Sequence, residues 1–457
     1  MTEATTLSPF DRLDSLLAYA TARQPAHRIS GKVARISPTY IVVTGLSKFV
    51  SIGDAVSIAG VGGAVLAEVA SIESQTINVT PFIADHRIEL GARVTAMSGQ
   101  LTLSPHESWL GRTINALGHP IDDAGPLLAG DRAVPIQGSP PAAMRRNRLG
   151  EALTTGVKAI DLFTPICAGQ RIGIFAGSGV GKSTLLGMLS RAPSSDVTVL
   201  ALVGERSREV RDFLDDTLKA SRSRVIAVVA TSDESPMMRR MAPCAAMCIA
   251  EFYRDRGKNV LLIIDSLTRY AHSMRELALA ADEPPVARGY PPSVFSALPK
   301  LLERAGTGED GAGTITAILS VLIDGDDHND PIADATRGIL DGHIVLDRAI
   351  ASQGRLPAVD PLASLSRLAP KIRTKKQAQF ATQLIELISR FEDTRDLRAI
   401  GGYRNGSDAT LDQAMEIVPR LYDALKQNLD EDPVEDVFAF LSQTLPSSQR
   451  SGSAAAR

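Results

Sequence analysis

The segment IGIFAGSGVGKSTLLGML, residues 172–189, decides the fold of this chain. Its first residues, up to Ala176, are apolar like a buried strand, and a glycine-rich turn joins them to an apolar helix that begins with Lys182 and Ser183. The strict form of this pattern has Gly where the chain has Ala176. The turn keeps its flexibility through three later glycines, Gly177, Gly179 and Gly181. A strand, such a turn and a helix predict a loop that wraps nucleotide phosphates with backbone amides and a helix N-terminus.

The residues expected to bind the nucleotide are the turn and the first residues of the helix. In such loops the lysine, here Lys182, reaches the β- and γ-phosphates, and the hydroxyl, here that of Ser183, ligates the Mg²⁺ that accompanies ATP. The full set is Gly177, Ser178, Gly179, Val180, Gly181, Lys182, Ser183 and Thr184.

Two carboxylates follow other apolar runs. Asp265 ends NVLLIID, and Glu205 follows the run that opens LALVGERSREV. The carboxyl ends of parallel strands share one edge of a sheet, so both are expected beside the phosphate loop. Asp265 is expected to orient Mg²⁺ and its waters; the alternative is that it is only a polar residue at the end of a strand. Glu205 is expected to polarise the water that attacks the γ-phosphate. Without a phosphate loop nearby, the same residue would be interpreted as a solvated glutamate at the start of a helix over 205–219.

Arg206 is the third charged residue expected at this edge. It either neutralises phosphate charge or holds Glu205 in place. A site that only binds nucleotide does not need a carboxylate beside the γ-phosphate, so Glu205 and Asp265 together predict Mg²⁺-dependent ATP hydrolysis.

The pattern of residue types divides the chain into three regions. Short β-branched segments over residues 26–96 predict a small β-barrel. Apolar strands that alternate with helical stretches over 97–370 predict an α/β P-loop domain with a mainly parallel sheet, and 371–445 is expected to be a helical domain. The strands expected in the P-loop domain are 171–177, 196–204, 224–231, 259–265, 314–323 and 343–347.

The two ends are expected to lie outside these domains. Residues 1–25 contain an amphipathic pattern at 8–22, typical of a helix that either binds a partner protein or packs onto its own domain. Residues 446–457 have the composition of a disordered tail.

Composition excludes several classes of protein. The chain has 49 basic and 52 acidic residues and a net charge of −3, so no basic excess predicts binding to nucleic acid. Its apolar runs are too short to span a bilayer, and its N-terminus lacks the layout of a signal peptide. Three cysteines, Cys167, Cys244 and Cys248, indicate a reducing compartment and neither a disulfide scaffold nor a zinc site. The acidic loop at 324–330 lacks the ligand spacing of a calcium loop and is interpreted as solvated.

Several motifs resemble one known family. AGSGVGKST, GERSRE, LLIIDSLTRYA, RGYPPSVFSALPKLLERAG and PAVDPLASLSR are together similar to the hexameric rotary-type ATPases, over about residues 25–430. Within that family GYPPSVF, GDDHNDPIADATRGILDGHIVLDR and GGYRNGSDATLDQA resemble the branch specific to flagellar type III protein export. The sibling branch, the injectisome ATPases of virulence secretion, is the alternative.

The resemblance implies a RecA-like fold for the P-loop domain and a homohexamer with an active site at each subunit interface. The family's arginine finger falls on Arg367, which would reach the neighbour's γ-phosphate in trans. The tyrosine that packs on adenine in the ATP synthase is replaced by Leu356. Tyr403 is then a candidate for stacking on the base, or a core tyrosine.

The resemblance also implies partners and a location. The N-terminal segment would bind a stator-like regulatory protein, and the ring would receive export-gate and chaperone–substrate complexes, energising or assisting the unfolding and delivery of export substrates. Such a protein is cytoplasmic and peripheral at the inner-membrane export apparatus. Two other classes are alternatives: a non-catalytic ring subunit, which has Gln in place of Glu205, and an RNA-translocating ring ATPase, which needs a nucleic-acid site that the barrel sequence does not indicate.

Overall fold

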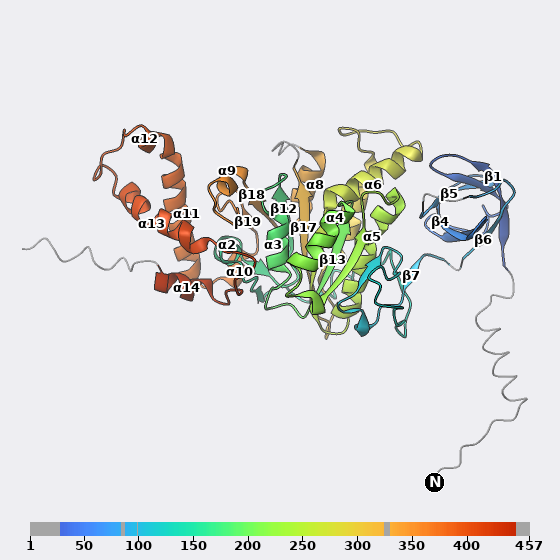
Figure 1. Cartoon of the computed structure of the whole chain (residues 1–457), viewed down its shortest axis with the longest axis horizontal. Helices are drawn as coiled ribbons and strands as arrows, with labels where there is room; N and C mark the ends of the chain where they lie inside the picture. Colours follow the sequence, from blue (N-terminus) through green and yellow to red (C-terminus); the bar gives the residue numbers. More distant parts are fainter. Residues whose placement is uncertain (1–27, 84–86, 98, 324–329, 445–457) are drawn as a thin grey trace, which may run out of the picture. The chain divides into compact units, whose positions relative to one another are not determined.

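The computed structural model describes residues 28–83, 87–97, 99–323 and 330–444 (Figure 1). They fall into two compact units divided between Leu101 and Thr102, and each unit is described by itself. Three expectations concern residues outside the described ranges, namely the helix at 8–22, the acidic loop except Asp330, and the tail at 446–457.

Six antiparallel strands close into a barrel in the first unit, in the order β1-β2-β5-β4-β3-β6. Apolar side chains at alternate positions, such as Val56 and Ile58, fill its core. Gly31 is required where β1 meets β2, because a Cβ there would lie 2.1 Å from the carbonyl oxygen of Thr44. The predicted barrel is confirmed, and β6 is a strand that the sequence analysis did not identify. The strands are β1 (Ser30–Ile36), β2 (Ile41–Thr44), β3 (Ala55–Gly60), β4 (Gly63–Ile72), β5 (Thr76–Pro81) and β6 (Arg93–Ala96).

A nine-stranded sheet forms the core of the second unit. Eight strands follow the order β19-β18-β12-β17-β15-β13-β14-β8, and β16 pairs with β17. The pairs are parallel except those of β16 and β19, which confirms the mainly parallel sheet. The six predicted strands are present, with ends that differ by at most one residue. The strands are β8 (Thr113–Asn115), β12 (Arg171–Ala176), β13 (Val197–Val203), β14 (Val225–Ala230), β15 (Asn259–Asp265), β16 (Gly306–Thr307), β17 (Thr314–Leu322), β18 (Gly342–Leu346) and β19 (Leu365–Ser366).

Helices cover both faces of this sheet (Figure 1). One face packs against α2, α3 and the joined segments α4 and η2, and α5 and α6 pack against the other. All seven residues of β13 are buried, as expected for a strand covered on both faces. The helix expected at 205–219 is shorter than predicted, because it begins at Ser207 and continues as a π-helix. The helices are α2 (Lys158–Phe163), α3 (Lys182–Leu189), α4 (Ser207–Asp212), η2 (Phe213–Thr217), α5 (Pro236–Arg254), α6 (Leu267–Ala280), α7 (Pro292–Leu302), α8 (Pro331–Ile339), α9 (Arg348–Ser352) and α10 (Ala369–Ile372).

Short elements complete the sheet region. Two small two-stranded sheets pair β7 with β9 and β10 with β11. Their bounds, with two single-turn 3-10 helices, are β7 (Thr102–Leu103), η1 (Glu107–Trp109), β9 (Val134–Pro135), β10 (Ala152–Leu153), β11 (Ile166–Cys167) and η3 (Arg222–Arg224).

Helices alone form the C-terminal part of the second unit, as the sequence predicted. Thr374 and Gln377 form a capping box at the start of α11, and the Asp408 carboxylate caps α13. Their apolar faces pack together and against Phe163 of α2, so the helices join the same compact unit as the sheet, and a domain boundary at residue 371 stays a prediction. The helices are α11 (Lys375–Asp393), α12 (Arg395–Ala399), α13 (Ala409–Leu425) and α14 (Val437–Thr444).

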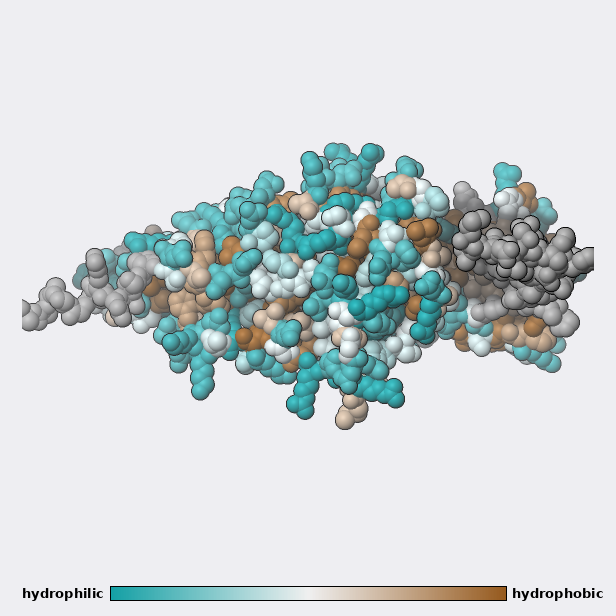
Figure 2. Space-filling model, turned by 90° about the horizontal axis from the view of Figure 1, so that it is seen from below, coloured by the Kyte–Doolittle hydropathy of each residue, from teal (hydrophilic) through white to brown (hydrophobic). Residues whose placement is uncertain are grey.

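Figure 2 shows one face of the molecule, on which hydrophilic residues predominate and apolar ones are scattered. Among the described residues no helix has the length and apolar character needed to cross a membrane. All three cysteines are free thiols. Cys244 and Cys248, one helical turn apart, are expected from the sequence to be buried small apolar residues; Cys248 is buried, but Cys244 is partly exposed, and Cys167 is also buried.

Candidate active site

The predicted phosphate loop joins β12 to α3. Two of its glycines have left-handed backbone conformations, with φ of 76° at Gly179 and 87° at Gly181, which other residues rarely adopt. Lys182 is the first residue of α3, and the apolar residues of that helix face the sheet core. The loop therefore ends at a helix N-terminus whose free amides face the space above the sheet edge.

A cavity of about 720 Å³ opens at this edge. Every predicted loop residue lines it except Val180, which is buried beneath the turn. Glu205, Arg206 and Asp265 line it as well, so the structure brings together all of the predicted site residues except Val180, Arg367 and Tyr403.

Lys182 lies between the two predicted carboxylates. Its Nζ contacts Oδ1 of Asp265 and lies 3.6 Å from Oε1 of Glu205. Ser320, on the neighbouring strand β17, donates a hydrogen bond of 2.6 Å to the same Asp265 oxygen. The Asp265 side chain is only 6% exposed, so this buried charge is satisfied by the lysine and the serine hydroxyl.

The surroundings of Glu205 change its proton affinity. Burial raises the pKa of the Glu205 carboxyl, and the charge of Asp265 adds to this effect, whereas Lys182 and Arg269 oppose it. A carboxylate with a raised pKa is a stronger base than an exposed glutamate, which suits a group that takes a proton from water.

Arg269, on α6, is a site residue that the sequence analysis missed. Its side chain lines the cavity, and in the described part of the chain its buried Nε has no hydrogen-bond partner. Gly204 makes room for it, because a Cβ at Gly204 would lie 3.1–3.3 Å from the Arg269 side chain. The motif LLIIDSLTRYA contained the only signal, an arginine one helical turn after Asp265.

Arg206 does not hold Glu205 in this structure. Its side chain is 82% exposed and pairs with Glu209, at 3.5 Å, on the same helix. Lys182 is the cation that pairs with Glu205, so of the two roles predicted for Arg206 only contact with phosphate charge is compatible with its position at the cavity wall.

Arg367 lies at the opposite edge of the sheet from the phosphate loop. It follows β19, and its backbone amide donates to the carbonyl of Asp341, immediately before β18. Strand β12 separates that edge from the loop, and its six residues span about 20 Å. An arginine side chain is too short to cover that distance, so Arg367, which is exposed, cannot reach the phosphate cavity of its own chain.

Tyr403 lies in the helical region and does not line the phosphate cavity. Its hydroxyl donates to Asp412, at 2.8 Å, and it packs against the helical core. The structure therefore supports the core alternative and not stacking on the base. Leu356, in contrast, lies beside the phosphate loop, with its Cδ2 3.7 Å from the position of a Cβ on Gly181.

Comparison with known proteins places this site in a family. Residues 156–366 match the nucleotide-binding domain of the ATP synthase alpha/beta family, and residues 373–443 match the T3SS EscN ATPase C-terminal domain. A flagellum-specific ATP synthase of Rhizobium meliloti is 56% identical over 415 residues, which are 91% of this chain and 89% of that protein. The chain belongs to the ATP synthase alpha/beta family.

Other similar proteins are named as ATPases of type III secretion systems. A type 3 secretion system ATPase of Xanthomonas euvesicatoria is 42% identical over 92% of this chain and 94% of that protein. The assembled ATPase EscN of enteropathogenic E. coli, also solved in complex with its central stalk EscO, superposes with a TM-score of 0.83 at 37% identity, over 91% of this chain and 98% of EscN. These matches confirm the resemblance, the fold and the ATP-hydrolysing activity that the sequence predicted.

Proposed function

We propose that this chain is the Mg²⁺-dependent ATPase of a flagellar type III protein export apparatus. The observation that carries the hydrolytic part is the convergence of Glu205 and Asp265 on Lys182 at the phosphate loop. The flagellar part rests on the 56% identity to the Rhizobium meliloti protein. A non-catalytic ring role is disfavoured because Glu205, and not Gln, lies at the cavity.

The residues present fit Mg²⁺. Ser183 and Asp265 offer a hydroxyl and a carboxylate at the cavity, which are hard oxygen ligands. The described residues contain no group of three His, Cys, Asp or Glu able to hold a metal, which fits an ion bound jointly with nucleotide phosphates and not by a protein cage. When bound, Mg²⁺ neutralises charge on the β- and γ-phosphates.

The catalytic step assigns a role to each side chain. Lys182 exchanges its contact with Asp265 for the phosphates, and Ser183 and Asp265 would hold Mg²⁺ and its waters. Glu205 accepts a proton from the attacking water as the water oxygen bonds to the γ-phosphorus and the bond to the ADP oxygen breaks. Arg269 lies close enough to add positive charge at this point.

Arg367 completes the site from a neighbouring subunit. Because it lies at the other edge of its own sheet, it can serve only another copy of the chain, as in a ring. EscN, at 37% identity, is solved in an assembled state, which supports assembly of this chain with copies of itself. We therefore propose a homohexamer in which each interface pairs Glu205 of one subunit with Arg367 of the next.

The partners follow from the same proposal. The complex of EscN with its central stalk supports a stalk-like partner here, and residues 8–22 are proposed to bind a stator-like regulatory protein. The ring would act on the cytoplasmic side of the export apparatus, bound peripherally at the membrane, and receive chaperone–substrate complexes at the export gate. Deletion of residues 1–25 should abolish binding of the regulator and leave nucleotide binding intact.

The decisive experiment compares Glu205→Gln with Asp212→Asn. The first should lower ATP turnover by about 10²–10⁴-fold with nucleotide affinity unchanged, because only proton transfer is lost. The second changes an exposed carboxylate on α4 that pairs with Arg208 and does not line the cavity, so it should turn over at close to the wild-type rate. In a strain that lacks the gene, the wild type should restore motility and Glu205→Gln should not. Restored virulence secretion with unchanged motility would instead assign the chain to an injectisome.

A further inference from the structure

The loop that carries Leu356 to the phosphate site is anchored in the C-terminal helices. It follows α9, and 42% of the Leu356 side chain is exposed at the rim next to Gly181. The Leu356 carbonyl accepts a hydrogen bond of 2.9 Å from the backbone amide of Gln427, just after α13. The loop that borders the nucleotide site is therefore held in part by the C-terminal helices.

Gln427 is itself fixed by three bonds. It is 4% exposed, its amide nitrogen donates to the Gly156 carbonyl at 2.8 Å, and its side-chain oxygen accepts from the Lys158 backbone amide at 3.0 Å. The position of Leu356 thus depends on a buried polar contact between the helical region and α2.

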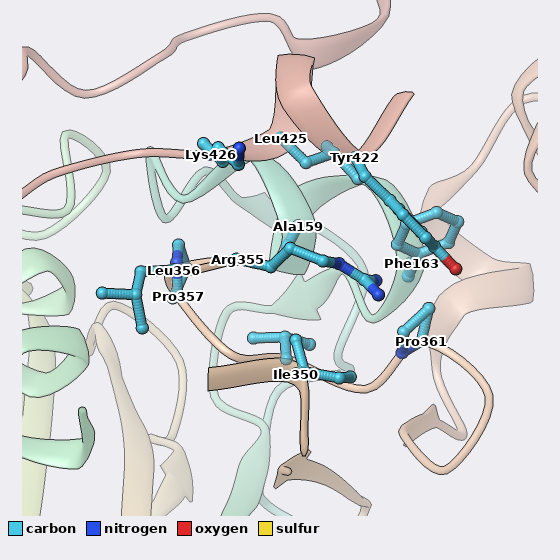
Figure 3. A pocket seen from close by; sticks show the side chains of 11 residues that line it. Ala159, Phe163, Ile350, Arg355, Leu356, Pro357, Pro361, Tyr422, Leu425 and Lys426 are labelled. Carbon is cyan, nitrogen blue, oxygen red and sulfur yellow. The ribbon is translucent and has the colours of Figure 1, made fainter. Parts of the chain in front are cut away.

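Arg355 forms the second anchor. Its guanidinium carbon lies 3.2 Å from the ring centroid of Tyr422, on α13, and its Nη1 lies 3.7 Å from Glu392, on α11. Burial raises the pKa of Tyr422, so its hydroxyl keeps the proton that it donates to Glu392 at 2.6 Å. Figure 3 shows that Arg355 and Leu356 project to opposite sides of the loop, with the guanidinium facing the Tyr422 ring.

Arg355 and Leu356 are consecutive residues, so contacts that fix Arg355 also restrict the position of Leu356. The Arg355 side chain is only 14% exposed and is held by two helices, so the backbone between it and Leu356 has little freedom. A leucine has no polar atom to orient a base, so what it contributes at the rim is a fixed apolar surface. That surface is useful only when its position is fixed.

We propose that Arg355 is a positioning residue for the nucleotide base, which holds Leu356 at the rim of the phosphate loop by stacking on Tyr422 and pairing with Glu392. The proposal rests on the proposed ATPase function and adds that base affinity depends on α11 and α13. The phosphates, which bind at the loop and at Lys182, do not depend on this anchor.

The test separates the base from the phosphates. Arg355→Ala should raise the KM for ATP about tenfold, the size of a lost desolvated cation–π contact, with kcat within about twofold. The inhibition constant of Mg-tripolyphosphate, which has no base, should not change. Arg420→Ala, an exposed arginine on the same helix as Tyr422, is the control and should change neither constant.

Variants of Tyr422 keep the test decisive if Arg355→Ala does not fold. Tyr422→Leu removes the ring and should give the same selective loss of ATP affinity, whereas Tyr422→Phe keeps the ring and should stay within about threefold of the wild type. Equal losses for ATP and tripolyphosphate, or an unchanged KM in both Arg355→Ala and Tyr422→Leu, would overturn the proposal. Failure of the ATPase proposal would appear elsewhere, as hydrolysis that survives Glu205→Gln.

Discussion

Lys182 and Asp265 form an ion pair between the first residue of α3 and the last residue of β15. Lys182, the cation proposed to bind phosphate, thus contacts Asp265, the carboxylate proposed to bind the metal. We expect a triphosphate that enters the cavity to offer Lys182 a stronger anion than Asp265, so that nucleotide binding releases Asp265. Ser320 should still donate to Asp265 after that exchange, because its hydrogen bond does not involve the lysine.

Lys182→Ala should weaken ATP binding by roughly 10–150-fold, the range expected for the loss of a charge-assisted contact. The two carboxylates would also repel the phosphates once their shared cation is gone. Titration with a fluorescent ATP analogue measures the change. Lys219→Ala, a lysine outside the cavity lining, is the control and should bind ATP as the wild type does. ATP affinity within twofold of the wild type in Lys182→Ala would contradict the role of Lys182.

The pH dependence of turnover should report the raised pKa of Glu205. Only the ionised carboxylate accepts a proton, so kcat should fall on acidification through that pKa, at a higher pH than for an exposed glutamate. Glu209→Gln removes a like charge that raises this pKa, and it should shift the acid limb to lower pH. The measurement is the kcat profile from about pH 4.5 to pH 8 at saturating ATP. An acid limb that does not move in Glu209→Gln would show that another group limits the rate.

The packing of α3 gives a prediction on stability. A Cβ at Gly187 would lie 2.3 Å from Cγ2 of Thr217 and 3.2 Å from Cδ1 of Leu429, so Gly187→Ala should lower the free energy of unfolding by about 1–3 kcal/mol. Gly338, in α8, is a matched helical glycine, and a Cβ added there would have no neighbouring atom within 4 Å. Gly338→Ala should be neutral or stabilise by up to about 1 kcal/mol. Thermal unfolding of both variants checks this, and equal midpoints would refute the packing argument.

The sequence predicted those parts of the site that depend on strand order. Glu205 and Asp265 follow apolar runs, and the carboxyl ends of parallel strands meet at one edge, so their closeness could be inferred without coordinates. Arg269 was missed because its place depends on the space left by Gly204, which no periodicity encodes. Tyr403 was considered for the base because its motif resembled a family motif, but the pattern did not show which way the loop folds.

The barrel strand β6 and the extent of the helix after Glu205 are two further features that the local sequence did not predict. β6 has four residues with one buried side chain, too short for alternation to identify it. The stretch at 205–219 has helical composition throughout, yet its second half is a π-helix packed beside α3. In both cases tertiary contacts, and not local sequence, determine the outcome.

The position of Arg367 gives the sharpest prediction, because it links mechanism to assembly. Arg367→Ala should keep ATP affinity within a few-fold, since Lys182 and Ser183 lie in the chain that binds the phosphates. Turnover should fall by at least about 10³-fold, as expected when a contact to transition-state charge is lost. Lys371→Ala, an exposed cation near the same sheet edge, should retain turnover.

Mixing Arg367→Ala with Glu205→Gln tests whether the arginine acts in trans. In a mixed ring, a subunit with Arg367→Ala keeps its own Glu205 and receives Arg367 from a Glu205→Gln neighbour, so some interfaces are complete. Partial ATPase activity should therefore return, although each variant alone is inactive. Arg367 lies about 20 Å of strand away from the loop of its own chain, so no rearrangement within one subunit explains such recovery. A mixture that is shown to co-assemble and yet stays inactive would remove the main support for the trans arrangement.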